Sequence, residues 1–235
     1  MRRIIAAVVL IALGVTLLAS IKMLPKYLAA EIEKVIREEV VVENLEISIK
    51  SHSGFPLLLG KIDEVDVKAT NLIVEGLTVD KLEVEVKDLK LDIQSLFRDQ
   101  ELAFQDVDSI TAWVALSEET INNYYHQYVD QQQAFVIDLA EDGAILNGSI
   151  KFWNVTWDVA LKGRFEITGP THMQIRFLPE ELLIADTRFP QVLLEIINDQ
   201  YQFAFDFSSL PVPIELNQVK TEGNTLMIFG SSPNR

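Results

Sequence analysis

Three histidines, His52, His126 and His172, are the residues best suited to acid–base or metal chemistry in this sequence. None of them lies at metal-ligand or catalytic-triad spacing from other candidate residues. The sequence also lacks a nucleophile elbow, a glycine-rich phosphate loop and a zincin motif. We therefore expect ordinary solvated or partly packed histidines, no catalytic residues, no cofactor and no enzymatic activity.

Carboxylates are plentiful, so a pair of them carries little information. Asp138, Glu141 and Asp142 could bind Ca²⁺, but their spacing does not match an EF-hand loop, and a solvated turn is the simpler interpretation.

There is no cysteine, which excludes disulfides, zinc–thiolate sites and thiol catalysis. We predict no metal site.

The net charge of −15 limits the partners of this chain. Nucleic acid is a poor partner for so acidic a surface. Adsorption onto anionic lipid headgroups is also disfavoured. If the protein meets lipid, we expect it to do so through an apolar cavity or lip and through a membrane anchor; the sequence names no protein partner.

The N-terminus carries the clearest hydrophobic signal. After Arg2 and Arg3, the 18 residues from Ile4 to Ile21 contain no charge, and Lys22 ends the run. As a helix this run would be about 27 Å long, close to the roughly 30 Å of a bilayer core. We interpret residues 1–25 as an uncleaved signal anchor, a transmembrane helix with these representative positions: Ile4, Leu10, Leu17 and Ile21.

Two alternatives to the anchor stay open, a cleaved signal peptide and a buried core helix. With the anchor retained, we expect a single-pass protein of the cell membrane whose following domain, residues 26–235, lies outside the cytoplasm, on the periplasmic or cell-wall side.

Residues Lys26 to about Glu39 are predicted to form an amphipathic helix. Its apolar residues recur at helical spacing and are Leu28, Ile32, Val35 and Ile36. We expect this helix to pack on the domain core. The alternative, a helix lying on the membrane surface, is less favoured because its polar face is not basic.

From Val41 the apolar period changes to two, which is typical of β-strands. Gly54-Phe55-Pro56 interrupts the pattern. The stretch from Val79 to Ile93 is the most regular, but its phase shifts by one residue at Lys87-Asp88. A one-residue slip exchanges the two faces of a strand unless a bulge compensates. We therefore predict a long, strongly bent strand or a tight corner near Asp88.

The second half of the chain continues the β-pattern around two short helices. Ser117 is a predicted N-cap for a helix that continues to about Gln131. Phe203, Phe205 and Phe207 alternate along one face of a strand. The other predicted elements are strands near 110–116, 135–139, 145–153, 155–167 and 173–177, a helix at 191–200, and a C-terminal hairpin of 214–220 and 225–229 around Gly223-Asn224.

Several short motifs, taken in order, resemble the LmeA-like phospholipid-binding family. They are GFPLLLGKIDEVDV (residues 54–67), LIVEGLTVDKL (72–82), WVALSEE (113–119) and LPVPI (210–214), and the resemblance covers roughly residues 26–230. It implies an α+β fold akin to tubular lipid-binding domains, in which a long, strongly curved antiparallel sheet wraps one or two helices and leaves an apolar groove. It also implies phospholipid binding and a role in the cell envelope, and it brings no catalytic motif.

An area estimate made without the family agrees with a groove. About eight strands give a sheet face of roughly 950 Å², whereas the predicted helices cover on the order of 550 Å². The sheet could curl to close this gap, or the gap could be a groove that holds lipid. The candidate groove-lining residues are Leu72, Val74, Leu82, Val84, Val86, Ile121, Tyr125, Tyr128, Leu193 and Ile197.

Two functions follow from these alternatives. The first is a membrane-anchored, extracytoplasmic protein that holds the acyl chains of a phospholipid or a similar lipid in the groove, with a role in the handling of envelope lipids. The second is a structural or interaction module of the envelope with a filled core and no ligand. Bound lipid would distinguish them.

Overall fold

The structure is a computed structural model that describes residues 23–232 apart from 53, 75, 142, 153, 186, 190–202 and 209–213. The predicted anchor with Ile4, Leu10, Leu17 and Ile21, and the predicted helix 191–200 with Leu193 and Ile197, lie outside the described residues. Among the residues that are described, no helix is both long enough and apolar enough to cross a membrane.

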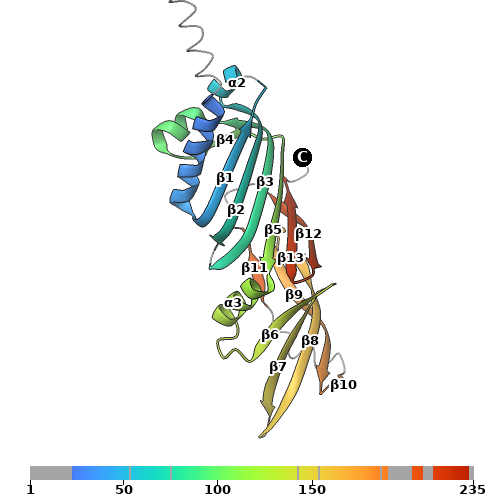
Figure 1. Cartoon of the computed structure of the whole chain (residues 1–235). Helices are drawn as coiled ribbons and strands as arrows, with labels where there is room; N and C mark the ends of the chain where they lie inside the picture. Colours follow the sequence, from blue (N-terminus) through green and yellow to red (C-terminus); the bar gives the residue numbers. More distant parts are fainter. Residues whose placement is uncertain are drawn as a thin grey trace, which may run out of the picture. The chain divides into compact units, whose positions relative to one another are not determined.

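Two β-sheets contain most of the described residues, with few helices (Figure 1). The seven-stranded sheet has the order β1-β2-β3-β5-β13-β12, with β4 paired to β3. Its strands are β1 (Val41–Lys50), β2 (Lys61–Val74), β3 (Leu77–Leu91), β4 (Phe104–Asp106), β5 (Ser109–Ser117), β12 (Glu215–Glu222) and β13 (Thr225–Ser231).

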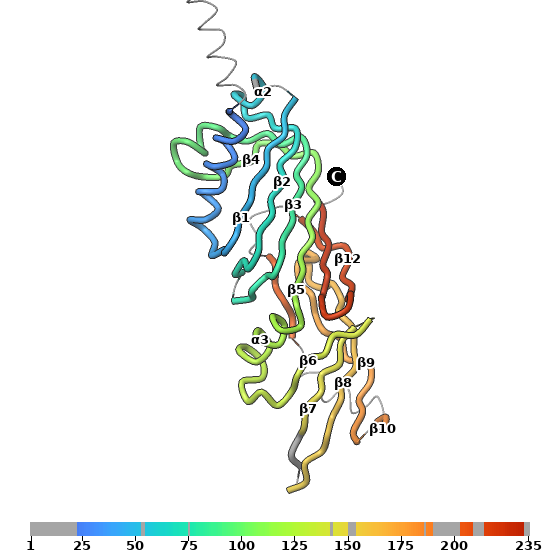
Figure 2. Tube along the Cα trace, viewed as in Figure 1, coloured from blue at the N-terminus to red at the C-terminus, as the bar shows by residue number. Residues whose placement is uncertain are grey.

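The six-stranded sheet has the order β10-β9-β8-β7-β6, with β11 paired to β9. Neighbouring strands along β6 to β9 are consecutive in the chain and antiparallel, as the trace in Figure 2 shows. Its strands are β6 (Phe135–Ala140), β7 (Gly143–Phe152), β8 (Val155–Thr168), β9 (Gln174–Ile184), β10 (Thr187–Arg188) and β11 (Ala204–Asp206).

The α+β class is confirmed, but the prediction of one long, strongly curved sheet is wrong. The strands form two sheets, and neither is strongly curled (Figure 1). The break falls between β5 and β6, where helix α3 (Glu118–Tyr128) intervenes. Side chains of α3 occupy the backbone groups of β6, as described below, so β6 ends its sheet.

The chain forms two compact units, and β1, β2, β3 and β5 contribute residues to both. The first unit comprises Met1–Val40, Leu45–Lys68 and Val84–Ile110, and the second comprises Val41–Asn44, Ala69–Glu83 and Thr111–Arg235. The expectation of one domain over residues 26–235 stays a prediction.

In the first unit, an N-terminal helix over residues 23–39 packs on the sheet. This confirms the predicted helix and its packing on the core. Two short elements, α2 (Gly54–Leu58) and the π-helical turn η1 (Ser95–Asp99), complete the unit. The buried core consists of Leu28, Ile32, Val35, Leu57, Ile62, Val65, Leu89, Leu91 and Leu96.

The phase shift in β3 has a local cause at Asp88. Its φ is +48°, in the left-handed region, although it is not a glycine. Across this residue the buried positions change from even to odd numbers, from Val84 before it to Leu89 and Leu91 after it. Asp tolerates this conformation better than most residues. The predicted irregularity is therefore a single left-handed residue within one continuous strand.

In the second unit, β12 and β13 form the predicted C-terminal hairpin, and β13 pairs with β5. Gly223 supplies a φ of +58° at its turn. The buried Thr221 hydroxyl donates to the carbonyl of Gly143 over 3.3 Å, which joins β12 to the start of β7. The predicted strands near 135–139, 145–153, 155–167 and 173–177 correspond to β6, β7, β8 and β9.

Candidate functional site

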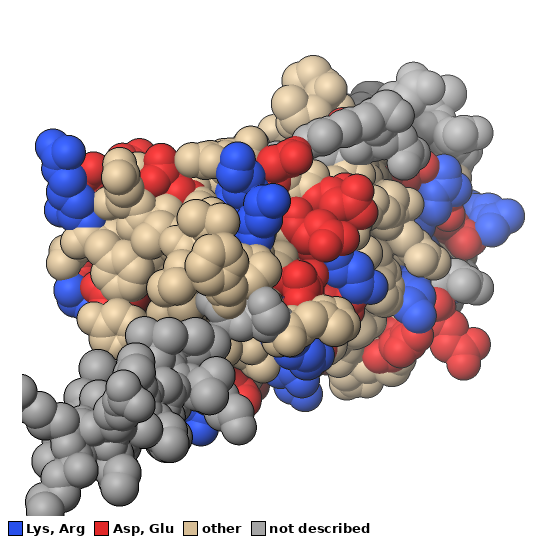
Figure 3. All heavy atoms as spheres, turned by 90° about the horizontal axis from the view of Figure 1, so that it is seen from above, with Lys and Arg blue, Asp and Glu red and all other residues tan. Residues whose placement is uncertain are grey.

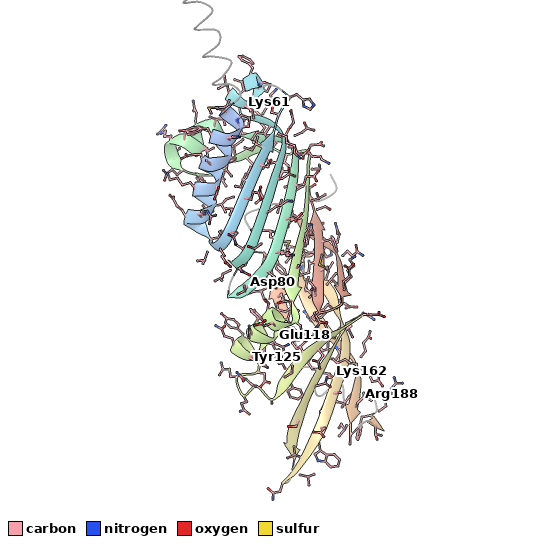
Figure 4. The ribbon with its side chains drawn as sticks, viewed as in Figure 1. Lys61, Asp80, Glu118, Tyr125, Lys162 and Arg188 are labelled. Atoms are coloured by element: carbon pink, nitrogen blue, oxygen red, sulfur yellow. The ribbon has the colours of Figure 1, made fainter. Side chains whose placement is uncertain are left out.

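Helix α3 carries three of the predicted site residues, Ile121, Tyr125 and Tyr128. Ser117 caps it, because its hydroxyl accepts a hydrogen bond from the Thr120 amide over 3.2 Å, as the sequence predicted. Asp80 of β3 accepts from both the amide and the hydroxyl of Ser117, at 2.6 and 3.1 Å. Figure 4 labels Asp80 of β3 together with Glu118 and Tyr125 of α3. The strand therefore fixes where the helix begins.

Four polar side chains on or just after α3 bind the backbone of the edge strand β6. Asn122 accepts from the Ile137 amide and donates to the Ile137 carbonyl, both over 2.7 Å. The remaining contacts are Glu118 with the Leu139 amide (2.8 Å), Asp130 with the Phe135 amide (2.8 Å) and His126 with the Phe135 carbonyl (2.7 Å). We call this set the edge ladder.

The edge ladder substitutes for a neighbouring strand. An exposed strand edge presents unpaired backbone groups that invite pairing with other chains. Alternate residues of β6 are satisfied by side chains instead, and the helix is held along the strand. The helix ends at Tyr128, three residues earlier than predicted. Asp130 therefore lies outside the helix, where its carboxylate accepts a hydrogen bond from β6.

Helix α3 also carries tyrosines whose rings meet Phe205 of β11 and Phe203 just before it, and Phe203 in turn contacts rings of β8 and β9. The Tyr125 ring lies 5.1 Å from that of Phe203, and the Tyr124 ring lies 5.3 Å from that of Phe205. Phe203 stacks on Phe177 at 5.6 Å. The members of this aromatic cluster are Tyr124, Tyr125, Tyr128, Phe165, Phe177, Phe203 and Phe205.

Burial within the aromatic cluster is graded. Tyr125 is 0% exposed, Tyr124 is half-buried, and Tyr128 is 50% exposed although its ring lies 4.7 Å from that of Tyr124. The Tyr128 hydroxyl lies over Gly76, where a Cβ would come within 2.0 Å of it. A contiguous set of rings therefore runs from the protein interior to the surface beside the turn between β2 and β3.

The histidines have structural surroundings. His52 donates its amide to Asp63 over 2.6 Å, and its exposed ring lies 2.7 Å from the same carboxylate. These two hydrogen bonds, the amide first, hold the pKa of Asp63 below its usual value. His126 belongs to the edge ladder, and His172 has a φ of +51°. In the described part of the chain, no three His, Asp or Glu residues are grouped so as to hold a metal ion.

A comparison with family models matches residues 20–231 to the family described as LmeA-like phospholipid-binding. The match covers nearly the whole sequence. The chain belongs to the LmeA-like phospholipid-binding family. Comparisons with curated proteins and with solved structures gave no match.

For this LmeA-like protein, the predicted groove-lining residues divide between the two units. Val84 and Val86 belong to the first unit, where Val86 packs against the core. Six others belong to the second unit: Leu72, Val74, Leu82, Ile121, Tyr125 and Tyr128. Of these, Leu72, Ile121 and Tyr125 are buried, Val74 and Leu82 are half-buried, and Tyr128 is exposed. Their role in lining a groove stays a prediction.

The sequence indicated only part of the aromatic cluster of this LmeA-like protein. The alternation of Phe203, Phe205 and Phe207 predicted one face, and all three side chains are buried. Phe165 and Phe177 gave no separate signal, because each reads as an ordinary inward residue of an alternating strand. Their direct pairing in β8 and β9, with rings 5.7 Å apart, depends on register.

Proposed function

We propose that this protein is anchored in the cell membrane by residues 4–21 and binds phospholipid outside the cytoplasm, with acyl chains held against the aromatic cluster of the second unit. The observation that carries the proposal is the match to a phospholipid-binding family over residues 20–231. The graded burial from Tyr125 to Tyr128 supports the second unit as the place, since it provides apolar contact from the surface inward.

The free energy of moving an acyl chain between a bilayer and the protein suits a protein that exchanges lipid with a membrane. Removing an acyl chain from water is favourable by about 0.8 kcal/mol for each methylene. A chain that comes from a bilayer is already out of water, so most of this free energy is not gained again. The protein must therefore offer packing comparable to that of a bilayer, and release back to the membrane is not strongly opposed. We infer a role in the handling of envelope lipids.

The sharpest test combines native mass spectrometry with photo-crosslinking. The protein would be exchanged against vesicles of phosphatidylcholine and phosphatidylglycerol that contain a phospholipid with a diazirine in its acyl chain. We expect a stoichiometric lipid adduct and crosslinks in peptides that contain residues 118–128 and 203–207. A lipid with the diazirine in its headgroup is the control, and it should give fewer crosslinks to the buried residues.

One observation favours a second function, a scaffold with a filled core. Ile121, Tyr125 and Phe177 are each fully buried, so the interior is packed without any ligand. A protein that serves only as a structural or interaction module of the envelope would keep this packing. A clean ligand-free mass, together with no uptake from vesicles and no acyl-chain crosslinks, would leave the scaffold as the better account.

A further inference from the structure

The first unit exposes a group of large apolar side chains at one end. They come from three elements: Met23 and Tyr27 on the N-terminal helix, Phe55 and Leu58 on α2 with Leu59 directly after it, and Phe97 on η1. Met23 is 70% exposed and Phe55 is 67% exposed. We call these six residues the apolar tip.

The protein core holds the three elements of the apolar tip together. Leu28 of the N-terminal helix, Leu57 of α2 and Leu96 of η1 are buried in the same cluster. Each of these residues lies next to, or one residue from, an exposed member of the tip in the sequence. In addition, the rings of Tyr27 and Phe97 stack at 5.8 Å. The exposure is therefore a property of a well-packed surface and not of a loose segment.

A surface of this kind needs an explanation. Single exposed apolar residues are common, but a group of them marks an interaction site. The view from above in Figure 3 shows an area of uncharged residues bordered by charged residues. Figure 4 places Lys61 at the same end, close to α2.

The sequence that precedes the apolar tip indicates what covers it. The uncharged run from Ile4 to Ile21 ends two residues before Met23. Two residues span at most about 7 Å of chain. If the run crosses the bilayer, as its length of roughly 27 Å as a helix permits, Met23 must lie at the membrane surface. The other tip residues belong to the same compact unit and are joined to its core.

The charge around the tip also differs from that of the whole chain. The segments 23–27, 54–61 and 95–99 contain three basic residues, Lys26, Lys61 and Arg98, and one acidic residue, Asp99. The complete chain has 20 basic and 35 acidic residues. Acidic residues elsewhere are repelled by anionic headgroups, whereas the tip is not. Tyrosine at the margin of such a surface also suits the headgroup level of a bilayer.

We propose that the apolar tip is a docking surface for the lipid bilayer, and that Phe55, Leu58 and Leu59 enter the membrane at the level of the headgroups and upper acyl chains. The docking orients the first unit on the membrane. It is a property of the first unit and is separate from lipid binding in the second unit, so either can fail without the other.

The test uses the full chain reconstituted in vesicles of phosphatidylcholine and phosphatidylglycerol. Because the protein has no cysteine, Leu58→Cys introduces one labelling site for an environment-sensitive fluorophore. Val136→Cys is the matched control, since Val136 is also an exposed aliphatic residue, 46% exposed, on β6 of the second unit. Thermal melting by circular dichroism verifies that both variants fold.

We expect the label at position 58 to shift its emission to the blue and to lose most of its intensity when the vesicles contain doxyl-labelled phosphatidylcholine. The label at position 136 should do neither. Adding Phe55→Asp and Leu59→Asp to the Leu58→Cys variant should reduce the quenching. Equal quenching at both positions would overturn the proposal. A blue shift at position 58 without quenching would also overturn it, because protein, either the N-terminal segment or a second copy, would then cover the tip. Lipid adducts measured by native mass spectrometry would be scored separately.

Discussion

Replacing Asn122 with alanine removes both hydrogen bonds between its side chain and the backbone of Ile137, each 2.7 Å long. A hydrogen bond within a protein contributes about 1 kcal/mol net, and a backbone group left without a partner costs somewhat more. Alanine is a better helix former than asparagine by about 0.6 kcal/mol, which offsets part of the loss. The expected net decrease in the free energy of unfolding is about 2 kcal/mol.

Asn123→Ala is the matched control for this substitution. Asn123 is the next residue of the same helix, has the same side chain and is exposed. Its replacement should bring only the gain in helix propensity. For a chain of this size, each kcal/mol moves Tm by about 2–4 °C. Asn122→Ala should therefore lower Tm by about 4–8 °C, while Asn123→Ala should leave it unchanged or raise it slightly.

Amide hydrogen exchange at Ile137 reports on the same bond directly. The Ile137 amide donates to the Asn122 side chain, so its exchange should accelerate about 30-fold for a local loss of 2 kcal/mol. Exchange at Leu139, whose amide donates to Glu118, should accelerate less. If the two asparagine variants have equal Tm values, or if Ile137 exchanges at the same rate in both, the edge ladder does not hold α3 on its sheet.

Three further predictions concern single sites. Gly76→Ala should lower the denaturant midpoint for two reasons: φ is +84° there, and the new Cβ would meet the Tyr128 hydroxyl. Adding Tyr128→Ala to this variant should restore only the part of the loss that comes from the contact with Tyr128, because the positive φ remains. The hydroxyl of Ser208 first, then its amide and Gln174, donate hydrogen bonds that hold the pKa of Asp206 below its ordinary value of 3.8. These hydrogen bonds therefore stabilise the folded protein above pH 3.8, and this stabilisation is lost as the pH falls through the lowered pKa. The difference in midpoint between the wild type and Asp206→Asn should accordingly be present at pH 7 and vanish in strong acid. Leu96→Ala, in the core of the first unit, should lower the free energy of unfolding by about 2–5 kcal/mol in chemical denaturation.

Most of the local structure could be predicted from the sequence because it depends on short-range rules. The alternation of apolar residues located the strands, and the change of phase at Asp88 located the irregularity in β3. Ser117 and the two acidic residues after it identified the start of α3. In each case the signal and its structural consequence lie within a few residues of each other.

The separation into two sheets could not be predicted in the same way. Alternation shows which side of a strand is apolar, but it does not show which strands are neighbours. The side chains that end the second sheet at β6 include Asn122 and Asp130, which are polar residues of a kind that usually faces solvent. Their role depends on where β6 lies relative to α3, and this contact between elements leaves no periodic pattern in the sequence.

For the candidate site, the sequence predicted which residues are apolar but not how deeply each of them is buried. Tyr125 and Ile121 were chosen for their helical spacing, and both are fully buried, so an acyl chain can reach them only if neighbouring side chains move. Tyr128 needs no such movement, because half of its surface is already exposed. A lipid that begins its contact at Tyr128 and proceeds toward Tyr125 would replace ring–ring contacts with ring–acyl contacts of similar strength. Opening the interior then costs little net packing energy. Under the proposed function, in which the protein returns its lipid to a membrane, this small difference favours release, because tight complementarity to an acyl chain would hinder it.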